Sequence, residues 1–159
     1  MIKCGKNEVT ITKTVASKLT NEMSIRLPSL SVNEGVARAI CASFCAQLDP
    51  TATEIADVKC AVSEAVTNAI VHGYRDGIGE IYINVRIYEE RVIRIDIRDK
   101  GRGIEDVKRA RQPLFTTDAE NERSGMGFTV MESFCDSVKV VSKLGKGTTV
   151  TLIKRFSER

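Results

Sequence analysis

The segment SEAVTNAIVHGY, residues 63–74, decides the fold of this 159-residue chain, because it places a long helix at the centre of the sequence. Apolar residues recur there at helical spacing and continue a stripe that begins upstream, which predicts a helix from Thr51 or Thr53 to His72. Gly73 is expected to end this helix as its C′ residue. The stripe consists of Ile55, Val58, Val62, Ala65, Val66 and Ala69.

Two polar residues of the same segment, Glu64 and Asn68, lie four positions apart and therefore share one face of the predicted helix, beside the apolar stripe. Taken alone, this E-x-x-x-N spacing is typical of a solvated helix face. The residue types also suit phosphate chemistry, since a carboxylate can act as a general base and an amide oxygen can hold Mg²⁺. The neighbouring motifs have to decide between these interpretations.

A β-hairpin is predicted after the helix, because two runs alternate between apolar and polar residues and so give one buried face. The sequence DKGRG, residues 99–103, ends the second run. The apolar members are Ile81, Ile83, Val85, Ile87, Ile93, Ile95 and Ile97.

Further elements flank this centre on both sides. Upstream, an edge strand is predicted over residues 23–28, and Ser31 and Glu34 have the spacing of a capping box that starts a helix ending near residues 49–50. Downstream, the expected elements are a short helix over 104–111, a stretch without periodicity over 114–124, a helix from Gly125 to about Phe134, and strands over 137–143 and 148–155.

The order β-α-α-β-β-α-α-β-β predicts an α+β fold: a two-layer sandwich in which helices cover one face of a mostly antiparallel sheet. One domain is expected over residues 23–159. Residues 1–22 are polar and are predicted to form a flexible N-terminal extension, in which Val9, Ile11 and Val15 are compatible with a short strand or with no regular structure.

Composition excludes several classes of function. Lys plus Arg number 24 and Asp plus Glu number 21, without a dense basic run, so no nucleic-acid partner is expected. No apolar stretch approaches the roughly 20 residues of a membrane span. The five cysteines form no CxxC pair and there is one histidine, so a zinc cluster is not expected. Three cysteines fall in the predicted helices and are expected to be buried free thiols, which fits a cytoplasmic protein.

Three glycine-containing motifs follow Glu64 and Asn68. Asp99, Gly101 and Gly103 form D-x-G-x-G at a strand end, where a carboxylate could bind an amine and glycines let a flat base approach. SGMG, residues 124–127, precedes a helix, whose N-terminus favours anions. GKGT, residues 145–148, enters the last strand. Each motif alone is typical of a turn or a helix cap, and the Rossmann, P-loop and protein-kinase signatures are absent.

The ordered set of motifs resembles the Bergerat ATP-binding fold of histidine kinases, type II topoisomerases, mismatch-repair ATPases and Hsp90-type chaperones. Within that superfamily, residues 63–74 and two further strings are similar to the anti-sigma F factors of endospore-forming bacteria. These strings are ARQPLFTT, residues 110–117, and ERSGMGFTVME, residues 122–132. Residues 33–50 are similar as well, and the resemblance covers the chain from about residue 21 to its end.

This resemblance implies a small serine kinase with ATP or ADP and Mg²⁺ in its pocket. Members of the family bind and inhibit a sporulation sigma factor. They also phosphorylate a serine of an anti-anti-sigma protein, which in its unphosphorylated form displaces the sigma factor. They act as homodimers that hold one sigma factor.

The resemblance also implies roles for individual residues. Glu64 would be the catalytic base and Asn68 would ligate Mg²⁺. Asp99 would accept a hydrogen bond from the adenine amino group, and Arg123 would lie near the terminal phosphate. Arg38 matches an arginine that the family uses towards its protein partners. The remaining nucleotide-binding residues would be Gly101, Gly103 and Thr148 at the base, and Thr116, Thr117, Ser124, Gly125, Met126 and Gly127 at the phosphates.

Two features depart from the family pattern. Residues 1–20 extend beyond its usual start, and Lys100 replaces a residue that is often acidic. Asp99 and the glycines are retained, so ATP binding is expected to survive.

Alternative functions remain compatible with the sequence. One is a module that binds nucleotide and sigma factor without transferring phosphate, and another is the related kinase of the general stress pathway. An ATPase fragment of a chaperone or repair protein is disfavoured by the short loop before residue 125. A histidine kinase is disfavoured because no phospho-acceptor histidine precedes residue 63.

Overall fold

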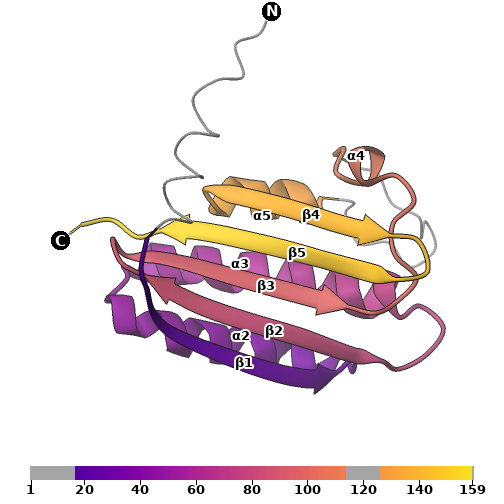
Figure 1. The fold of residues 1–159 in the computed structure, drawn as a ribbon, viewed down its shortest axis with the longest axis horizontal. Coiled ribbons are helices and arrows are strands. Elements are labelled where there is room, and N and C mark those ends of the chain that lie inside the picture. The colour runs from indigo at the N-terminus through magenta and orange to yellow at the C-terminus, as the bar shows by residue number, and fades with distance from the viewer. Residues whose placement is uncertain (1–16, 114–125, 159) are drawn as a thin grey trace, which may run out of the picture.

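The computed structural model of the chain describes residues 17–113 and 126–158. In this part of the chain, five strands form one sheet in the order β1-β2-β3-β5-β4, and every neighbouring pair is antiparallel. The strands are β1 (Leu19–Pro28), β2 (Glu80–Tyr88), β3 (Val92–Asp99), β4 (Ser137–Lys143) and β5 (Gly147–Arg155). Figure 1 shows β1 and β4 at the two edges of this sheet.

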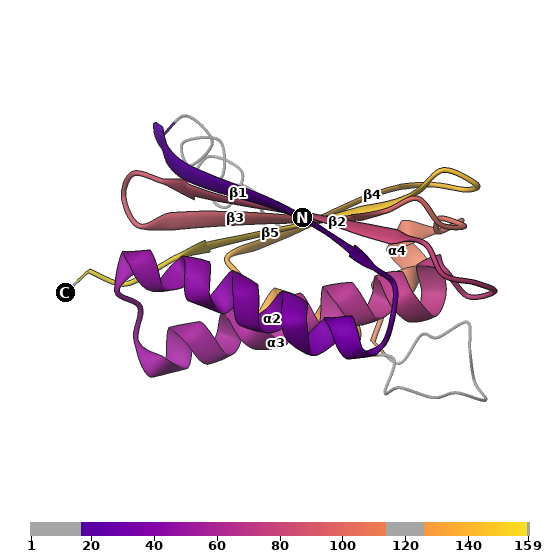
Figure 2. The ribbon, with the colours of Figure 1, turned by 90° about the horizontal axis from the view of Figure 1, so that it is seen from below.

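The helices, apart from one short helix beside β4, lie on one face of the sheet, which confirms the predicted two-layer α+β architecture. Figure 2 shows α2 and α3 side by side beneath the strands. The helical elements are α2 (Val32–Cys45), the 3₁₀ turn η1 (Ala46–Leu48), α3 (Ala52–Asn68), the π-helix η2 (Ala69–Gly73), α4 (Val107–Ala110) and α5 (Gly127–Phe134).

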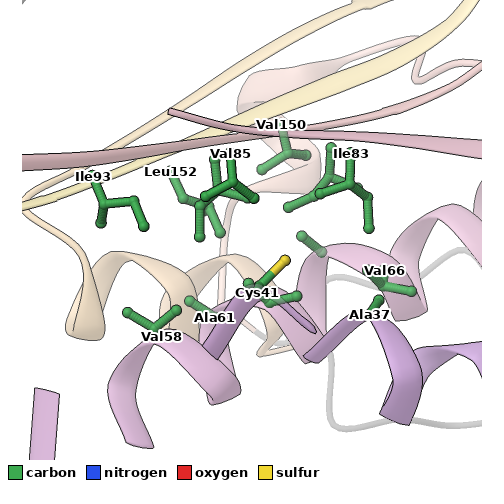
Figure 3. Close-up of a cluster of buried hydrophobic side chains, with 14 of the residues drawn as sticks. Ala37, Cys41, Val58, Ala61, Val66, Ile83, Val85, Ile93, Val150 and Leu152 are labelled. Carbon is green, nitrogen blue, oxygen red and sulfur yellow. The ribbon is translucent and has the colours of Figure 1, made fainter. Parts of the chain in front are cut away.

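The hydrophobic core fills the space between the two layers (Figure 3). The predicted alternation of the hairpin is confirmed, because the apolar residues of β2 and β3 named above are all at most 3% exposed. They pack against the α3 stripe, where Val58 and Val62 are buried with Ala65 and Val66. Burying one such side chain contributes about 1.5–3 kcal/mol, so this layer contact accounts for much of the folding free energy.

The opposite face of the sheet carries polar side chains. Asp96 of β3 lies at its centre and accepts hydrogen bonds from Arg86 at 3.1 Å, from Arg94 at 3.0 Å and from Thr151 at 2.6 Å. The residues that alternate with the core residues therefore satisfy one another across three neighbouring strands.

The predicted capping box at Ser31 and Glu34 is wrong. Ser31 has helical dihedral angles and makes no side-chain cap hydrogen bond, while Glu34 pairs with Arg38. The capping box is found instead at the next helix, where Thr51 Oγ1 accepts from the Glu54 N–H and Glu54 Oε2 accepts from the Thr51 N–H. A capping box needs an extended N-cap residue, and Thr51 has that conformation whereas Ser31 does not.

The expected C′ position of Gly73 is also wrong, because Gly73 is the last residue inside the helix and Tyr74 is the C-cap. The helix continues past Asn68 as the π-helix, with Tyr74 N–H donating to Ala69 O at 3.0 Å, and Gly73 is absent from the residues with positive φ. Glycine is required there for space, because a Cβ at position 73 would lie 2.8 Å from Asp99 Cγ.

Three smaller expectations differ from the structure. Strand β1 begins at Leu19, four residues before the predicted edge strand, because its first four residues are all exposed and so show no alternation of buried and exposed positions. Helix α4 is shorter than predicted and begins after Asp106, whose carboxylate accepts from Arg109 N–H at 3.0 Å. Cys60 is exposed, whereas Cys41 and Cys45 are buried free thiols as expected.

Candidate functional site

Helix α3 places Glu64 and Asn68 on the face against which the first residue of α5 lies. A Cβ at Gly127 would come within 3.1 Å of Glu64 Oε2 and 3.5 Å of both Asn68 Oδ1 and Asn68 Nδ2. Two motifs separated by about sixty residues are therefore in contact. The E-x-x-x-N face is not a plain solvated surface, because the N-terminus of another helix covers it.

A second group of predicted site residues meets at the end of β3. Asp99 is its last residue and is only 5% exposed. Its Oδ1 accepts from the Gly101 N–H at 2.9 Å. Thr148 lies opposite Asp99 in the ladder between β3 and β5, so two residues of the predicted base pocket are neighbours.

Burial raises the pKa of the Asp99 carboxyl above its ordinary value of 3.8, although backbone hydrogen bonds from Gly101 and Thr148 act in the opposite direction. These backbone hydrogen bonds offset part of the free energy that the Asp99 carboxylate loses when it gives up its hydration. An amine of a bound ligand would supply a further donor.

Close backbone packing explains two predicted glycines. A Cβ at Gly101 would lie 2.0 Å from Gly73 O, and the neighbouring Arg102 N–H donates to the same carbonyl at 2.9 Å. Gly103 has φ +76°, and a Cβ there would lie 2.3 Å from Lys143 O. A side chain at either position would force the D-x-G-x-G turn away from η2 or from β4.

The π-helix joins the two groups, since it runs from the residue after Asn68 to Gly73, whose α-carbon lies against Asp99. π-helical turns inside helices are frequent at functional sites. No pattern in the sequence indicates this turn or the role of Ser142, whose Oγ is 2.7 Å from Thr148 Oγ1 and accepts from the Ile104 N–H at 2.8 Å.

Arg38 does not enter this site. It lies on α2, 46% exposed at its side chain, with Nη1 3.4 Å from Ser63 Oγ and 3.5 Å from Glu34 Oε1. It is therefore one residue removed from Glu64 through Ser63, on the surface beside the catalytic candidate. Lys100 also points elsewhere, since its ammonium lies 4.8 Å from the centroid of the Tyr82 ring.

Met126 is the N-cap residue of α5, directly before Gly127. The other predicted phosphate-binding residues lie outside the described part of the chain. They are Thr116, Thr117, Arg123, Ser124 and Gly125.

The donor set fits Mg²⁺ bound mainly through a ligand. Among the described residues, no group of three or more His, Cys, Asp or Glu side chains could hold a metal ion by itself. Mg²⁺ usually keeps several waters and takes only one or two protein oxygens together with substrate phosphates. Asn68 Oδ1, beside Glu64 and the start of α5, offers such an oxygen.

Residues 27–154 match the family of histidine kinase-like ATPase domains. The chain is 55% identical over 141 residues to the anti-sigma F factor of Anoxybacillus flavithermus, and the matched region covers 88% of this chain and 96% of the relative. It is 52% identical over the same length to the anti-sigma F factor of Bacillus subtilis, again with 88% and 96% covered.

A solved structure of the RsbU and RsbW domains of a Mycobacterium tuberculosis protein has the same fold. It superposes with a TM-score of 0.64 at 23% identity, over 88% of this chain and 34% of that chain. In the described residues, no helix has the length and apolar character needed to cross a membrane.

The family model spans most of the chain, and both relatives are more than half identical to it over nearly their whole length. The chain belongs to the anti-sigma F factor family and carries its nucleotide-binding, histidine kinase-like ATPase domain.

Proposed function

We propose that the chain inhibits a sporulation sigma factor and, as an ATP-dependent serine kinase, phosphorylates the anti-anti-sigma protein that opposes it. The proposal is carried by one observation: Gly127, at the start of α5, lies against Glu64 and Asn68 on α3. This arrangement places a carboxylate and an amide oxygen beside a helix N-terminus, where phosphate groups bind favourably.

Base recognition is assigned to the other end of the site. Asp99 accepts a hydrogen bond from the adenine amino group, and Thr148 supports the same pocket from β5. Gly101 and Gly103 keep the turn flat enough for a purine to approach. The burial of Asp99 and its contact with the Gly101 N–H support this assignment.

Phosphoryl transfer is assigned to the residues around Asn68. Glu64 takes the proton of the incoming serine hydroxyl while the serine oxygen forms a bond to the γ-phosphorus. The bond between the γ-phosphorus and the β–γ bridging oxygen breaks, and ADP leaves with that electron pair. Asn68 would hold Mg²⁺, which neutralises phosphate charge when bound. Thr116, Thr117, Ser124, Gly125 and Met126 are proposed to surround the phosphates, and Arg123 to stabilise their charge.

Protein partners are assigned to the surface beside this site. Arg38, held next to Ser63, is proposed to contact the sigma factor or the anti-anti-sigma protein. The chain is proposed to act in the cytoplasm as a homodimer, and its relatives' name, anti-sigma F factor, supports a sigma factor as partner.

Phosphotransfer with γ-labelled ATP, Mg²⁺ and the anti-anti-sigma protein tests the kinase assignment. Glu64→Gln should abolish label transfer to a partner serine and leave ATP binding within about threefold of the parent, because an amide keeps the shape but cannot accept the proton. Glu89→Gln is the matched control, because it makes the same change at an exposed position in the turn between β2 and β3.

A second candidate is a module that binds nucleotide and sigma factor but transfers no phosphate. Binding of ATP without transfer to the anti-anti-sigma protein would favour it. Transfer to a partner from the general stress pathway, in preference to the sporulation partner, would instead assign the chain to that branch.

A further inference from the structure

The hydroxyl of Tyr74 bridges two backbone groups at the edge of the candidate base pocket. Tyr74 Oη accepts from the Lys100 N–H at 2.7 Å and donates to Glu80 O at 2.6 Å. A phenol offers one donor and readily accepts one hydrogen bond, so both functions of this hydroxyl are used.

The bridge lies where the ladder between β2 and β3 stops. Ile81 opposite Asp99 is the last pair of that ladder, and the next two residues outward are Glu80 and Lys100. These are the two residues whose backbone groups the Tyr74 hydroxyl joins. The hydroxyl thus occupies the place of the next direct backbone contact, while Glu80 still pairs with Pro28 of β1 on its other side.

The ring of Tyr74 is fixed on both sides of this bridge. Its N–H closes the π-helix by donating to Ala69 O, and its ring lies over Gly79, where a Cβ would come within 2.1 Å of Tyr74 Cε1. Position 79 must therefore lack a side chain for the ring to reach the gap between the strands.

The turn beyond Asp99 is held by the same short segment. Gly73 O accepts from the Arg102 N–H, and the adjacent Tyr74 hydroxyl accepts from the Lys100 N–H. Between these two contacts lies Gly101, whose N–H donates to Asp99 Oδ1. The direction of the Asp99 carboxylate is therefore fixed by a turn that residues 73 and 74 anchor at two points.

We propose that Tyr74 is a positioning residue for purine recognition: by keeping Lys100 apart from Glu80, its hydroxyl ends the ladder at Asp99 and aims that carboxylate at the exocyclic amine of the base. The proposal rests on the base-binding role of Asp99 given above. Without the hydroxyl, Lys100 N–H and Glu80 O are left to pair directly or to meet water, and either change displaces the turn that carries Gly101.

Binding of two nucleotides to the full-length chain tests the proposal. One is ATP, and the other is purine riboside triphosphate, which lacks the 6-amino group. Tyr74→Phe should lower the affinity for ATP about tenfold, which is the size expected for loss of one well-placed hydrogen bond. The affinity for the amino-free analogue should stay unchanged. The selectivity for the amino group should therefore fall by the same factor.

Tyr82→Phe is the matched control. The Tyr82 hydroxyl also contacts Glu80, but at the Oε2 of its side chain, at 2.7 Å. This variant should bind both nucleotides as the parent does. Gly79→Ala provides a second route, because the added methyl displaces the Tyr74 ring without removing its hydroxyl, and should give the same selective loss of ATP affinity if Tyr74→Phe folds poorly.

Equal weakening of both nucleotides by Tyr74→Phe would overturn the proposal and assign the hydroxyl to general stability. Unchanged affinity for both would overturn it as well. A parent protein that binds both nucleotides equally would instead remove the base-binding role of Asp99, and the positioning role of Tyr74 with it. A parent that binds neither would contradict the proposed ATP-dependent function itself.

Discussion

The α-carbon of Gly73 lies directly against the Asp99 carboxylate: a Cβ at position 73 would be 2.8 Å from Asp99 Cγ and 2.9 Å from Oδ1. The end of η2, which continues α3, and the end of β3 therefore share one surface. This contact links the two ends of the candidate site, to which phosphate binding and base binding are proposed.

Gly73→Ala is expected to weaken both ATP binding and stability. The methyl group meets a carboxylate that backbone contacts already fix, and such overpacking costs about 1–3 kcal/mol. Isothermal calorimetry and urea unfolding measure the two effects. Gly77→Ala is the matched control, because nothing lies within 4 Å of the added Cβ. Equal behaviour of the two variants would contradict the packing argument.

Asp99→Asn is expected to stabilise the nucleotide-free protein at neutral pH and to lower its affinity for ATP. Burial raises the folded-state pKa of Asp99, so its favourable contribution is complete below the ordinary pKa of 3.8 and is lost as pH rises through the folded-state pKa. Asparagine does not ionise, so the variant does not lose this stability as the pH rises. Urea unfolding over a range of pH should show a gain near pH 7 that shrinks on acidification. A variant that is less stable than the parent near pH 7 and equal to it at acidic pH would show that the hydrogen bonds from Gly101 and Thr148 outweigh burial.

Glu54→Gln is expected to destabilise the protein at neutral pH. Burial raises the pKa of Glu54, but hydrogen bonds from Ser157 and Thr51 outweigh it and lower the pKa from 4.5 to about 2. Its contribution is therefore present above pH 4.5 and is lost as the pH falls towards about 2. Glutamine has one carboxamide oxygen, whereas Glu54 uses two oxygens to accept from Thr51 N–H and Ser157 N–H.

Thermal unfolding of Glu54→Gln and the parent at several pH values checks this expectation. The difference in unfolding temperature should be largest near pH 7 and should narrow below pH 4.5. Glu89→Gln, at an exposed site, should leave the unfolding temperature nearly unchanged. A difference that is constant with pH would contradict the linkage.

Lys154→Met is expected to cost about 2–4 kcal/mol of unfolding free energy, because it leaves a partly buried carboxylate without its partner. The Lys154 ammonium donates to Asp57 Oδ2 at 3.1 Å and to Phe134 O at 2.8 Å, and so joins β5, α3 and the C-terminal end of α5. Urea unfolding measures the loss. The double variant Lys154→Met with Asp57→Leu should recover part of it, and a double variant no better than the single one would contradict the ion-pair explanation.

Local patterns predicted much of the fold. Strict alternation in β2 and β3 predicted their buried faces, since side chains on a strand point to opposite sides in turn. The apolar stripe predicted α3 and its core residues. Both patterns depend only on residues that are close in sequence, so the predictions made from them did not require knowledge of the rest of the chain.

Several features could not be predicted because they depend on contacts between distant segments. Gly73 is predicted from the sequence only as the residue that ends a helix, whereas in the structure it leaves space for the Asp99 carboxylate. Ser31 and Glu34 had the spacing of a capping box, but Ser31 lies in a helical conformation that does not allow it. Cys60 fell in a helical pattern like Cys41, yet it lies on the side of α3 that the sheet does not cover.

The sequence by itself determined the order of the elements, the buried faces of the hairpin and the helix, and the residue types available for nucleotide chemistry. Those properties follow from periodicity along the chain and from the chemistry of single side chains. Only the tertiary structure decided that Gly127 covers Glu64 and Asn68, and that Tyr74 and Gly73 anchor the turn after Asp99. These contacts join residues up to about sixty positions apart, and they form only when the helices pack on the sheet.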